Sequence, residues 1–296
     1  MNPKKWSRLS ILFILIGIAG MAYEGFRFTD KLPYFEKQWQ LDSIQELRIK
    51  SGSNVNMKFI PSQDGSNYIE VSGNMKQKLI DRLEASEVSG PKVSLDLTNP
   101  ESWSFFTVDF QTTDQAITVA LSDTELIERV QVELSHSNGT FNGLQANRIE
   151  LTTLSGNLKL DSASAEQLDM ETASGNITLS GLTGSARLKV VSGNIKADSV
   201  QGDLQAEGFS GNITIRDLQG SSVIKNTSGN VKLEDQRSDQ LDIKVTSGNV
   251  TLSQDQAFKG IYDLKAGSGT VKAPDSPMET RDVIKIRTNS GNIRID

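Results

Sequence analysis

The chain of 296 residues contains no cysteine. This absence excludes disulfide bonds, cysteine-ligated zinc sites, thiol catalysis and lipid attachment through an N-terminal cysteine. Aromatic residues make up only 6% of the sequence, too few to line large aromatic pockets. The single histidine, His136, cannot form a multi-histidine metal site, and dinucleotide, phosphate-loop and Gly-x-Ser-x-Gly patterns are missing. We therefore expect no metal, no cofactor and no nucleotide.

Basic residues are also in the minority. The sequence has 31 Lys and Arg against 37 Asp and Glu, a net charge of −6. A nucleic-acid-binding surface needs clustered basic side chains, and so does docking of a folded body on anionic lipid headgroups. The balance of charge therefore argues against both kinds of partner for the main body of the chain.

One apolar run stands near the N-terminus. Leu9–Tyr23 carries no charge and follows a tip, residues 1–8, with three basic side chains. A helix of this length rises roughly 23 Å, short of the roughly 30 Å hydrocarbon core, but flanking aromatic residues extend it to position 28. The pattern predicts one transmembrane helix over 9–28 that contacts the lipid bilayer, with the tip in the cytoplasm and the remainder outside the cell membrane. The alternative is a cleaved signal peptide.

The strongest signal is an internal repeat of the triplet Ser-Gly-Asn. The triplet begins at Ser155, Ser174, Ser192, Ser210, Ser228 and Ser247, with a degenerate copy at Ser268 and a last copy at Ser290. The first six copies are spaced by 18 or 19 residues, and each is flanked on both sides by alternating apolar and polar residues. Such alternation is typical of strands with one buried face. The sequence therefore predicts an all-β parallel β-helix, a solenoid of about 18-residue rungs, over 144–296. An antiparallel sandwich or propeller is the alternative, but a propeller blade needs about 40 residues.

The triplet is suited to a corner between two strands. Glycine adopts φ > 0 without steric cost, and asparagine stacked on successive rungs can form a hydrogen-bonded ladder. The predicted structural corners are Gly156, Asn157, Gly175, Asn176, Gly193, Asn194, Gly211, Asn212, Gly229, Asn230, Gly248 and Asn249.

The region before the repeat is less regular. We expect a connector over 29–40, then an irregular β section over 41–143 that contains one short helix at about 75–84 and forms a capping end. A further Ser-Gly-Asn at Ser72 looks like an early copy of the corner.

One column of polar residues is a candidate binding site. The residue four after each Ser is alternately basic and Thr, and the basic members are Lys159, Lys196, Lys232, Lys272 and Arg294. This column could bind an anionic cell-wall polymer, or simply be a solubilising face. Asp161, Asp198 and Glu234 also recur at one repeat position, as in polysaccharide-cleaving β-helices, but serines interrupt their column.

The early strand segment LRIKSGSNVNMKFIPS, followed by tandem Ser-Gly-Asn rungs, resembles the bacterial putative-adhesin family of β-helical domains over residues 41–296. With its apolar N-terminal segment, the chain is similar to membrane-anchored members encoded with a cell-envelope stress system of Gram-positive bacteria. The resemblance implies a non-catalytic structural or binding role at the cell envelope, with wall polymer or membrane stress-sensing proteins as partners. It offers no catalytic residue. A polysaccharide-acting enzyme and a self-assembling scaffold that polymerises through the ends of the rod remain the alternatives.

Overall fold

The computed structural model describes residues 32–99, 113–122, 127–238, 240–253 and 255–296. The predicted tip, 1–8, and the predicted transmembrane segment, 9–28, lie outside these residues. Among the residues described, no helix is both long and apolar enough to cross a bilayer. Tyr34–Asp296 forms one compact unit.

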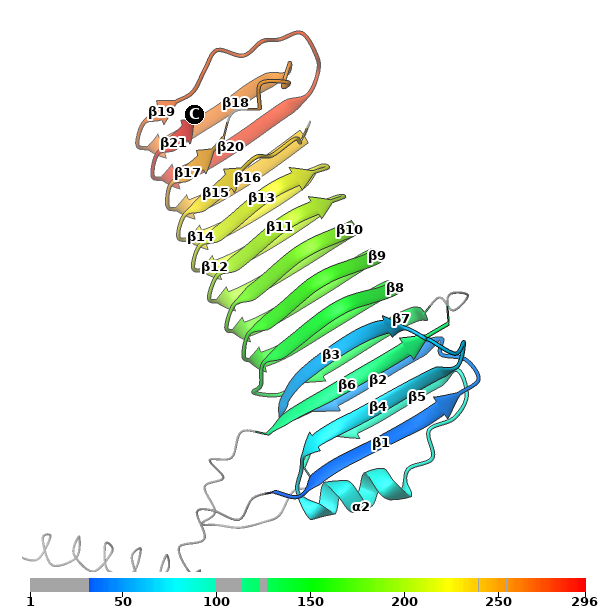
Figure 1. Cartoon of the computed structure of the whole chain (residues 1–296). Coiled ribbons are helices and arrows are strands. Elements are labelled where there is room, and N and C mark those ends of the chain that lie inside the picture. Colours follow the sequence, from blue (N-terminus) through cyan, green and yellow to red (C-terminus); the bar gives the residue numbers. More distant parts are fainter. Residues whose placement is uncertain (1–31, 100–112, 123–126, 239, 254) are drawn as a thin grey trace, which may run out of the picture. The chain divides into compact units, whose positions relative to one another are not determined.

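This unit is built almost entirely of strands (Figure 1). The strands are β1 Tyr34–Leu41, β2 Glu46–Ser51, β3 Asn54–Pro61, β4 Asn67–Asn74, β5 Lys92–Leu97, β6 Asp114–Leu121, β7 Ile127–Leu134, β8 Gly139–Ser155, β9 Leu158–Ser174, β10 Ile177–Ser192, β11 Ile195–Gln201, β12 Leu204–Ser210, β13 Ile213–Gln219, β14 Ser222–Ser228, β15 Val231–Glu234, β16 Gln240–Ser247, β17 Val250–Leu252, β18 Ile261–Ser268, β19 Val271–Lys272, β20 Val283–Ser290 and β21 Ile293–Ile295. The helix is α2, Gln77–Ala85, where the sequence predicts one at about 75–84.

The strands form a parallel solenoid with a Ser-Gly-Asn corner on the rungs of the repeat, replaced by Ser-Gly-Thr at Ser268. Strands that precede the corner stack on one another and make the pre-corner face, as in the pairing of β12 with β14. Strands that follow the corner make the post-corner face, as in the pairing of β13 with β15. Alternate side chains point inward and are buried, which is the expected result of period-2 alternation. No rung has a core of its own, so each depends on its neighbours.

The order of the rungs departs from the sequence at the C-terminal end. We expect consecutive stacking, but β20 pairs with β16 on one side and with β18 on the other. In the same way β21 lies between β17 and β19. The last rung of the chain, 283–295, is therefore inserted beneath the rung that precedes it in sequence, 261–272, and this earlier rung forms the end of the stack.

The N-terminal end has a matching insertion. β2 lies between β5 and β7, while β3 lies between β6 and β8, all in parallel pairs. Much of the region expected to be irregular, 41–143, is thus regular solenoid. The predicted connector 29–40 is also wrong in its second half, since β1 begins at Tyr34. The triplet at Ser72 is not a corner, because β4 runs through it and pairs antiparallel with β1 and β6.

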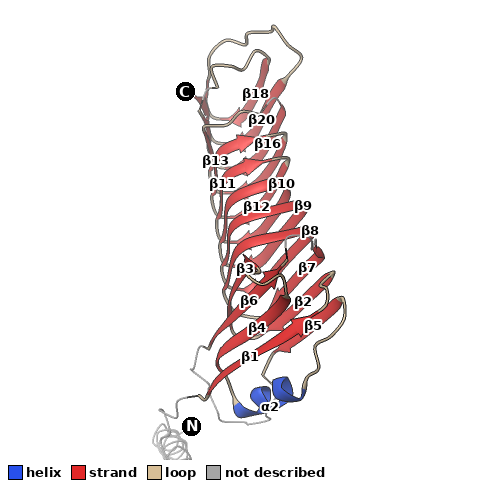
Figure 2. Cartoon of the chain, turned by 45° about the vertical axis from the view of Figure 1, so that its right-hand side comes forward, coloured by secondary structure: helices blue, strands red, loops and turns tan. Residues whose placement is uncertain are grey.

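The two ends of the unit differ in how they are closed. At the N-terminal end lies α2 (Figure 2). Its residues Leu79, Ile80 and Leu83 are buried in the core. The ammonium of Lys37 donates to the carbonyls of Leu83 and Glu84 at 2.9 Å, which places a positive charge at the C-terminal end of the helix. No helix of the described chain covers the C-terminal end, where β18 and β19 form the last rung.

Candidate functional site

A ladder of asparagine side chains runs along the Ser-Gly-Asn corners. Each Oδ1 accepts the backbone N–H of the next ladder residue at 2.8–3.0 Å, and most Nδ2 groups donate to the same oxygen. In spatial order the ladder consists of Asn54, Asn138, Asn157, Asn176, Asn194, Asn212, Asn230, Asn249 and Asn292. It ends where Thr270 donates to Asn292. Because these groups satisfy one another, the ladder is a device of the fold.

The glycine of each corner is required by the rung beneath it. From Gly156 to Gly248 the corner glycines have φ between +124° and +155°. A Cβ atom at these positions would lie only 1.9–2.1 Å from the carbonyl oxygen of the preceding corner. The glycine column therefore allows backbones to stack at close range, a stronger requirement than the sharp turn considered in the sequence analysis.

Buried hydroxyls support the corners from inside. Thr172 donates to the carbonyl of Gly156 at 3.1 Å, and Thr288 donates to that of Gly248 at the same distance. Asn226 occupies the equivalent position on β14 and donates to Gly211 at 2.9 Å. Its Oδ1 has no hydrogen-bond partner although the residue is only 3% exposed. The column stabilises the corner but contains this one unsatisfied atom.

The alternating Lys/Thr column lies in register on the post-corner face. Acidic residues two positions later in the strand neutralise several of its members. Lys159 pairs with Asp161 at 2.7 Å and Lys232 pairs with Glu234 at 2.5 Å. Hydrogen bonds from Lys232 and Arg216 lower the pKa of Glu234 to about 2. The column is thus largely compensated by its own strands.

Two further features of this face bear on its chemistry. Lys272 and Arg294 are direct neighbours because of the inserted last rung, so the alternation of charge ends there. Asp161 and Asp198 share one column but are separated by Ser180. Across the residues that the structure describes, no group of three or more acidic or histidine side chains is arranged to hold a metal ion.

A different column on the pre-corner face concentrates positive charge. It consists of Lys225, Lys244, Arg287 and Lys265 on four successive rungs, which we call the basic ladder. Lys225 and Lys244 are about half exposed and are paired with Glu207 at 3.6 Å and Asp242 at 3.0 Å. Sequence reasoning missed this ladder, although its members all stand three residues before the corner serine. Upstream rungs place Thr152, Glu171, Lys189 and Glu207 in that column, so only its C-terminal part is uniformly basic.

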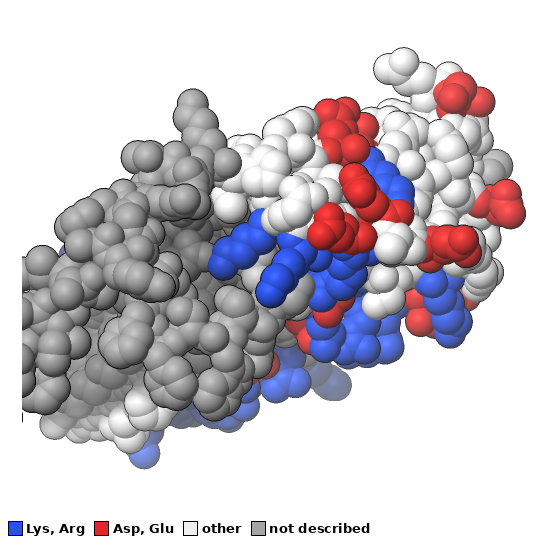
Figure 3. All heavy atoms as spheres, turned by 90° about the horizontal axis from the view of Figure 1, so that it is seen from below, with Lys and Arg blue, Asp and Glu red and all other residues white. Residues whose placement is uncertain are grey.

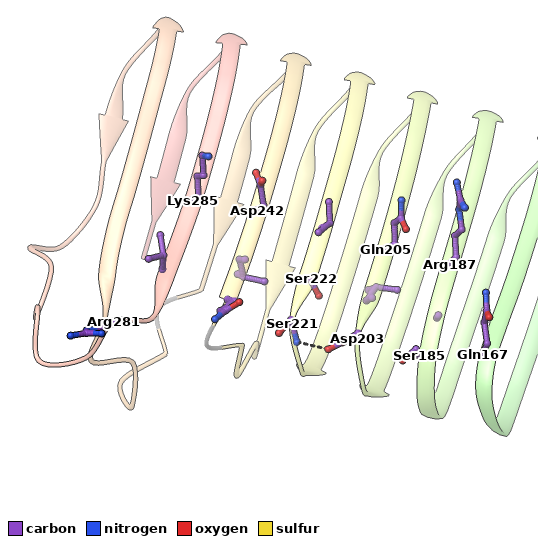
Figure 4. Close-up of a pocket in the computed structure, with 16 residues that line it drawn as sticks. Gln167, Ser185, Arg187, Asp203, Gln205, Ser221, Ser222, Asp242, Arg281 and Lys285 are labelled. Atoms are coloured by element: carbon purple, nitrogen blue, oxygen red, sulfur yellow. Dashed lines mark hydrogen bonds between the residues drawn. The ribbon is translucent and has the colours of Figure 1, made fainter. Parts of the chain in front are cut away.

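A shallow groove of about 730 Å³ lies beside the basic ladder on the same face. Figure 4 shows Arg187, Gln205, Asp242 and Lys285 in a row across the strands of this groove, with β14 between Gln205 and Asp242 and with Arg281 near its end. Lys285 lies two residues before Arg287 on β20, and Asp242 lies two residues before Lys244 on β16. Residues two apart on a strand point to the same face, so the groove and the ladder form one continuous surface. Seen from below, by contrast, Lys and Arg side chains lie next to Asp and Glu (Figure 3).

Comparisons with known proteins give one family and several distant folds. The sequence model of a family described as Toastrack DUF4097 matches residues 44–296. None of the curated proteins matches. Solved structures that are similar include an adhesin, titled putative, from Bacteroides fragilis, with 13% identity over 89% of this chain and 97% of that chain and a TM-score of 0.45. A protein titled a putative cell adhesion protein, from Clostridium sporogenes, has 11% identity over 90% and 99% and a TM-score of 0.27. A third, titled a putative adhesin, from Parabacteroides merdae, has 13% identity over 89% and 96% and a TM-score of 0.33.

Proposed function

The chain belongs to the Toastrack DUF4097 family. We propose that it is a non-catalytic binding protein whose solenoid holds a linear anionic polymer of the cell envelope against its pre-corner face. The observation that carries the proposal is the basic ladder of Lys225, Lys244, Arg287 and Lys265 on adjacent rungs.

What sets the ladder apart is that its four positive charges lie on adjacent rungs, although Lys225, Lys244 and Arg287 each have an acidic partner. Rungs of a sheet are about 4.8 Å apart, and like charges directly opposite one another on neighbouring strands are destabilising. The Lys/Thr column avoids this repulsion by alternation over most of its length, whereas the basic ladder does not. In the described chain neither Lys265 nor Lys285 forms an ion pair. A polyanion lying along the solenoid would contact the entire ladder, and a small anion only one or two of its members.

The cellular setting is part of the proposal. The apolar segment 9–28 anchors the chain in the membrane, with the solenoid on the outer side and in reach of wall polymers. The likeness to the membrane-anchored protein of the Lia system suggests a role in the envelope stress response, with membrane stress-sensing proteins as further partners. Lys159, Lys196, Lys232, Lys272 and Arg294 are a second, weaker surface for the same polymer, because alternation with Thr spaces most of their charges two rungs apart.

The test compares two matched double variants of the full chain in detergent. Lys225→Gln/Lys244→Gln removes two members of the basic ladder, and Lys159→Gln/Lys232→Gln removes two lysines of the other column. All four side chains are 51–53% exposed and each has one acidic partner or more. Binding to purified cell wall, with and without its anionic polymers, is measured across a salt series.

We expect the first variant to bind about 30-fold more weakly at low salt. Two lost contacts of about 1 kcal/mol each correspond to roughly that factor. The second variant should stay within about threefold of the unsubstituted chain, and binding should weaken as salt rises. Equal losses in the two variants, or no polymer-dependent binding of the unsubstituted chain, would refute the assignment of the basic ladder.

A further inference from the structure

The C-terminal end of the solenoid leaves part of its core uncovered. On β18 the inward-facing residues Tyr262, Leu264 and Ala266 are only half-buried, and Val271 on β19 is 46% exposed. Their counterparts one rung below, Ile284 and Ile286, are completely buried. The last rung therefore presents apolar side chains that another layer would cover.

The same rung has an unpaired backbone edge. Ile261 donates its N–H to Asp282 at 2.8 Å, so the odd-numbered backbone groups of β18 point toward β20. The even-numbered groups point away from it. The N–H of Tyr262 is bonded to the Ser276 hydroxyl at 2.9 Å. In the described chain β18 pairs only with β20, which leaves the N–H and C=O groups of Leu264 and Ala266 directed outward. Such an edge is a template for a further strand.

The side chains beside this edge are complementary to themselves. Asp263 and Lys265 flank Leu264 on the outward surface with opposite charges. Asp263 also pairs with Arg287 on β20, whereas Lys265 has no ion pair within the described chain. An antiparallel copy of β18, placed with Leu264 opposite Leu264 of the other copy, brings Asp263 opposite Lys265 twice. The same register sets Tyr262 opposite Ala266 and aligns the outward-directed N–H and C=O groups of Leu264 with those of the other copy, while the N–H of Tyr262 stays with Ser276. A two-fold contact thus satisfies the backbone, the charges and the apolar layer together.

We propose that the C-terminal end binds a second copy of this chain through antiparallel pairing of β18 with β18. The contact closes on itself, because a two-fold pairing uses the β18 edge of both copies. The product is an end-to-end dimer, which differs from the polymer that a scaffold open at both ends would form. The dimer does not require the polymer-binding function proposed above.

The absence of cysteine makes cross-linking of the full chain a direct test. Leu264→Cys places one thiol on the two-fold axis, opposite itself. Residues opposite each other in a hydrogen-bonded antiparallel pair have Cα atoms about 5.5 Å apart, within disulfide range. Val223→Cys, on the side of the solenoid and 40% exposed, is the matched control for random collision. We expect Leu264→Cys to form disulfide-linked dimers at least tenfold faster. Equal rates, or linked species larger than a dimer, would overturn the proposal.

Charge exchange tests the register separately. Lys265→Asp leaves Asp263 facing an aspartate in both pairs and should weaken dimerisation about tenfold, as measured by sedimentation of the detergent-solubilised chain. Lys265 has no ion pair within the described chain, so this variant removes no intramolecular partner. Mixing Lys265→Asp with Asp263→Lys should restore association as a heterodimer. A chain that stays monomeric at every concentration, or whose dimer ignores both substitutions, excludes this contact.

Discussion

Replacement of Gly193 by alanine tests whether close backbone stacking at the corner is what selects glycine. The new Cβ would lie 1.9 Å from the carbonyl oxygen of Gly175, and Gly193 has φ +139°. Because real Cβ contacts do not approach within about 3 Å, the two corners must separate by roughly 1 Å. Two hydrogen bonds cross this gap, from Gly175 N–H to the carbonyl of Ser192 and from Asn194 N–H to Asn176 Oδ1, both at 2.9 Å.

The expected loss follows from these contacts. Stretching two hydrogen bonds to about 3.9 Å loses roughly 0.5–1.5 kcal/mol each, and a non-glycine residue at this φ adds about 1–3 kcal/mol. We expect Gly193→Ala to lower the free energy of unfolding by about 2–6 kcal/mol in urea titration. Since stacked repeats unfold partly independently, hydrogen exchange at adjacent rungs should show the loss locally.

Two control substitutions separate the causes. Gly90 has φ +77° and nothing within 4 Å of its added Cβ, so Gly90→Ala reports backbone strain alone. Gly269 lies on the end rung, with its Cβ 2.1 Å from the carbonyl of Gly291, but it has no rung beyond it. We expect Gly269→Ala to cost less than Gly193→Ala because the end rung can move outward. If Gly193→Ala costs no more than Gly90→Ala, the stacking argument fails.

Two further substitutions probe the core and the post-corner face. Asn226→Thr removes the unpartnered Oδ1 and keeps a donor for the Gly211 carbonyl, as Thr172 does for Gly156, so stability should rise by about 1 kcal/mol in urea unfolding. A lower unfolding midpoint would contradict this account. Glu234 has its pKa lowered from 4.5 to about 2 by Lys232 and Arg216, so its contribution is present above pH 4.5 and is lost as pH falls toward 2. Glu234→Gln should make the melting temperature depend less on pH over that range. An unchanged pH dependence would refute the role of the contacts of Glu234 with Lys232 and Arg216.

The solenoid itself could be predicted because each rung repeats the same physical requirement at the same position. An aliphatic residue three after each serine, such as Ile195 or Ile213, must face a core shared with its neighbours, and this pattern is visible without a structure. The Ser-Gly-Asn pattern does not predict the rungs at Asn54 and Asn138, because their corners are Gly-Ser-Asn and His-Ser-Asn. Their asparagines join the ladder all the same, since the ladder requires the side-chain amide and not the full triplet.

The basic ladder and the order of the rungs differ in how far the sequence could reveal them. The ladder can be read from the sequence as four basic residues at one repeat position, although Thr152, Glu171 and Glu207 on upstream rungs interrupt the pattern. The order of rungs was not visible. Ser268 and Ser290 stand in equivalent corners that align in register, and both rungs carry apolar residues on the core face. Only three-dimensional pairing distinguishes the two arrangements.

The inserted rungs also determine how the C-terminal end can assemble. β18 pairs only with β20, and β19 pairs only with β21. The rung 261–272 therefore has no strand neighbour until residues 283–295, the last of the chain, have docked on β16 and β17. At this end the order of assembly is the reverse of the order in sequence. β20 and β21 are paired on both sides, and the exposed edge falls on β18, which is connected to paired strands at both of its ends. Such tethering limits the fraying to which chain termini are prone and keeps the edge of β18 in a fixed position for a partner strand.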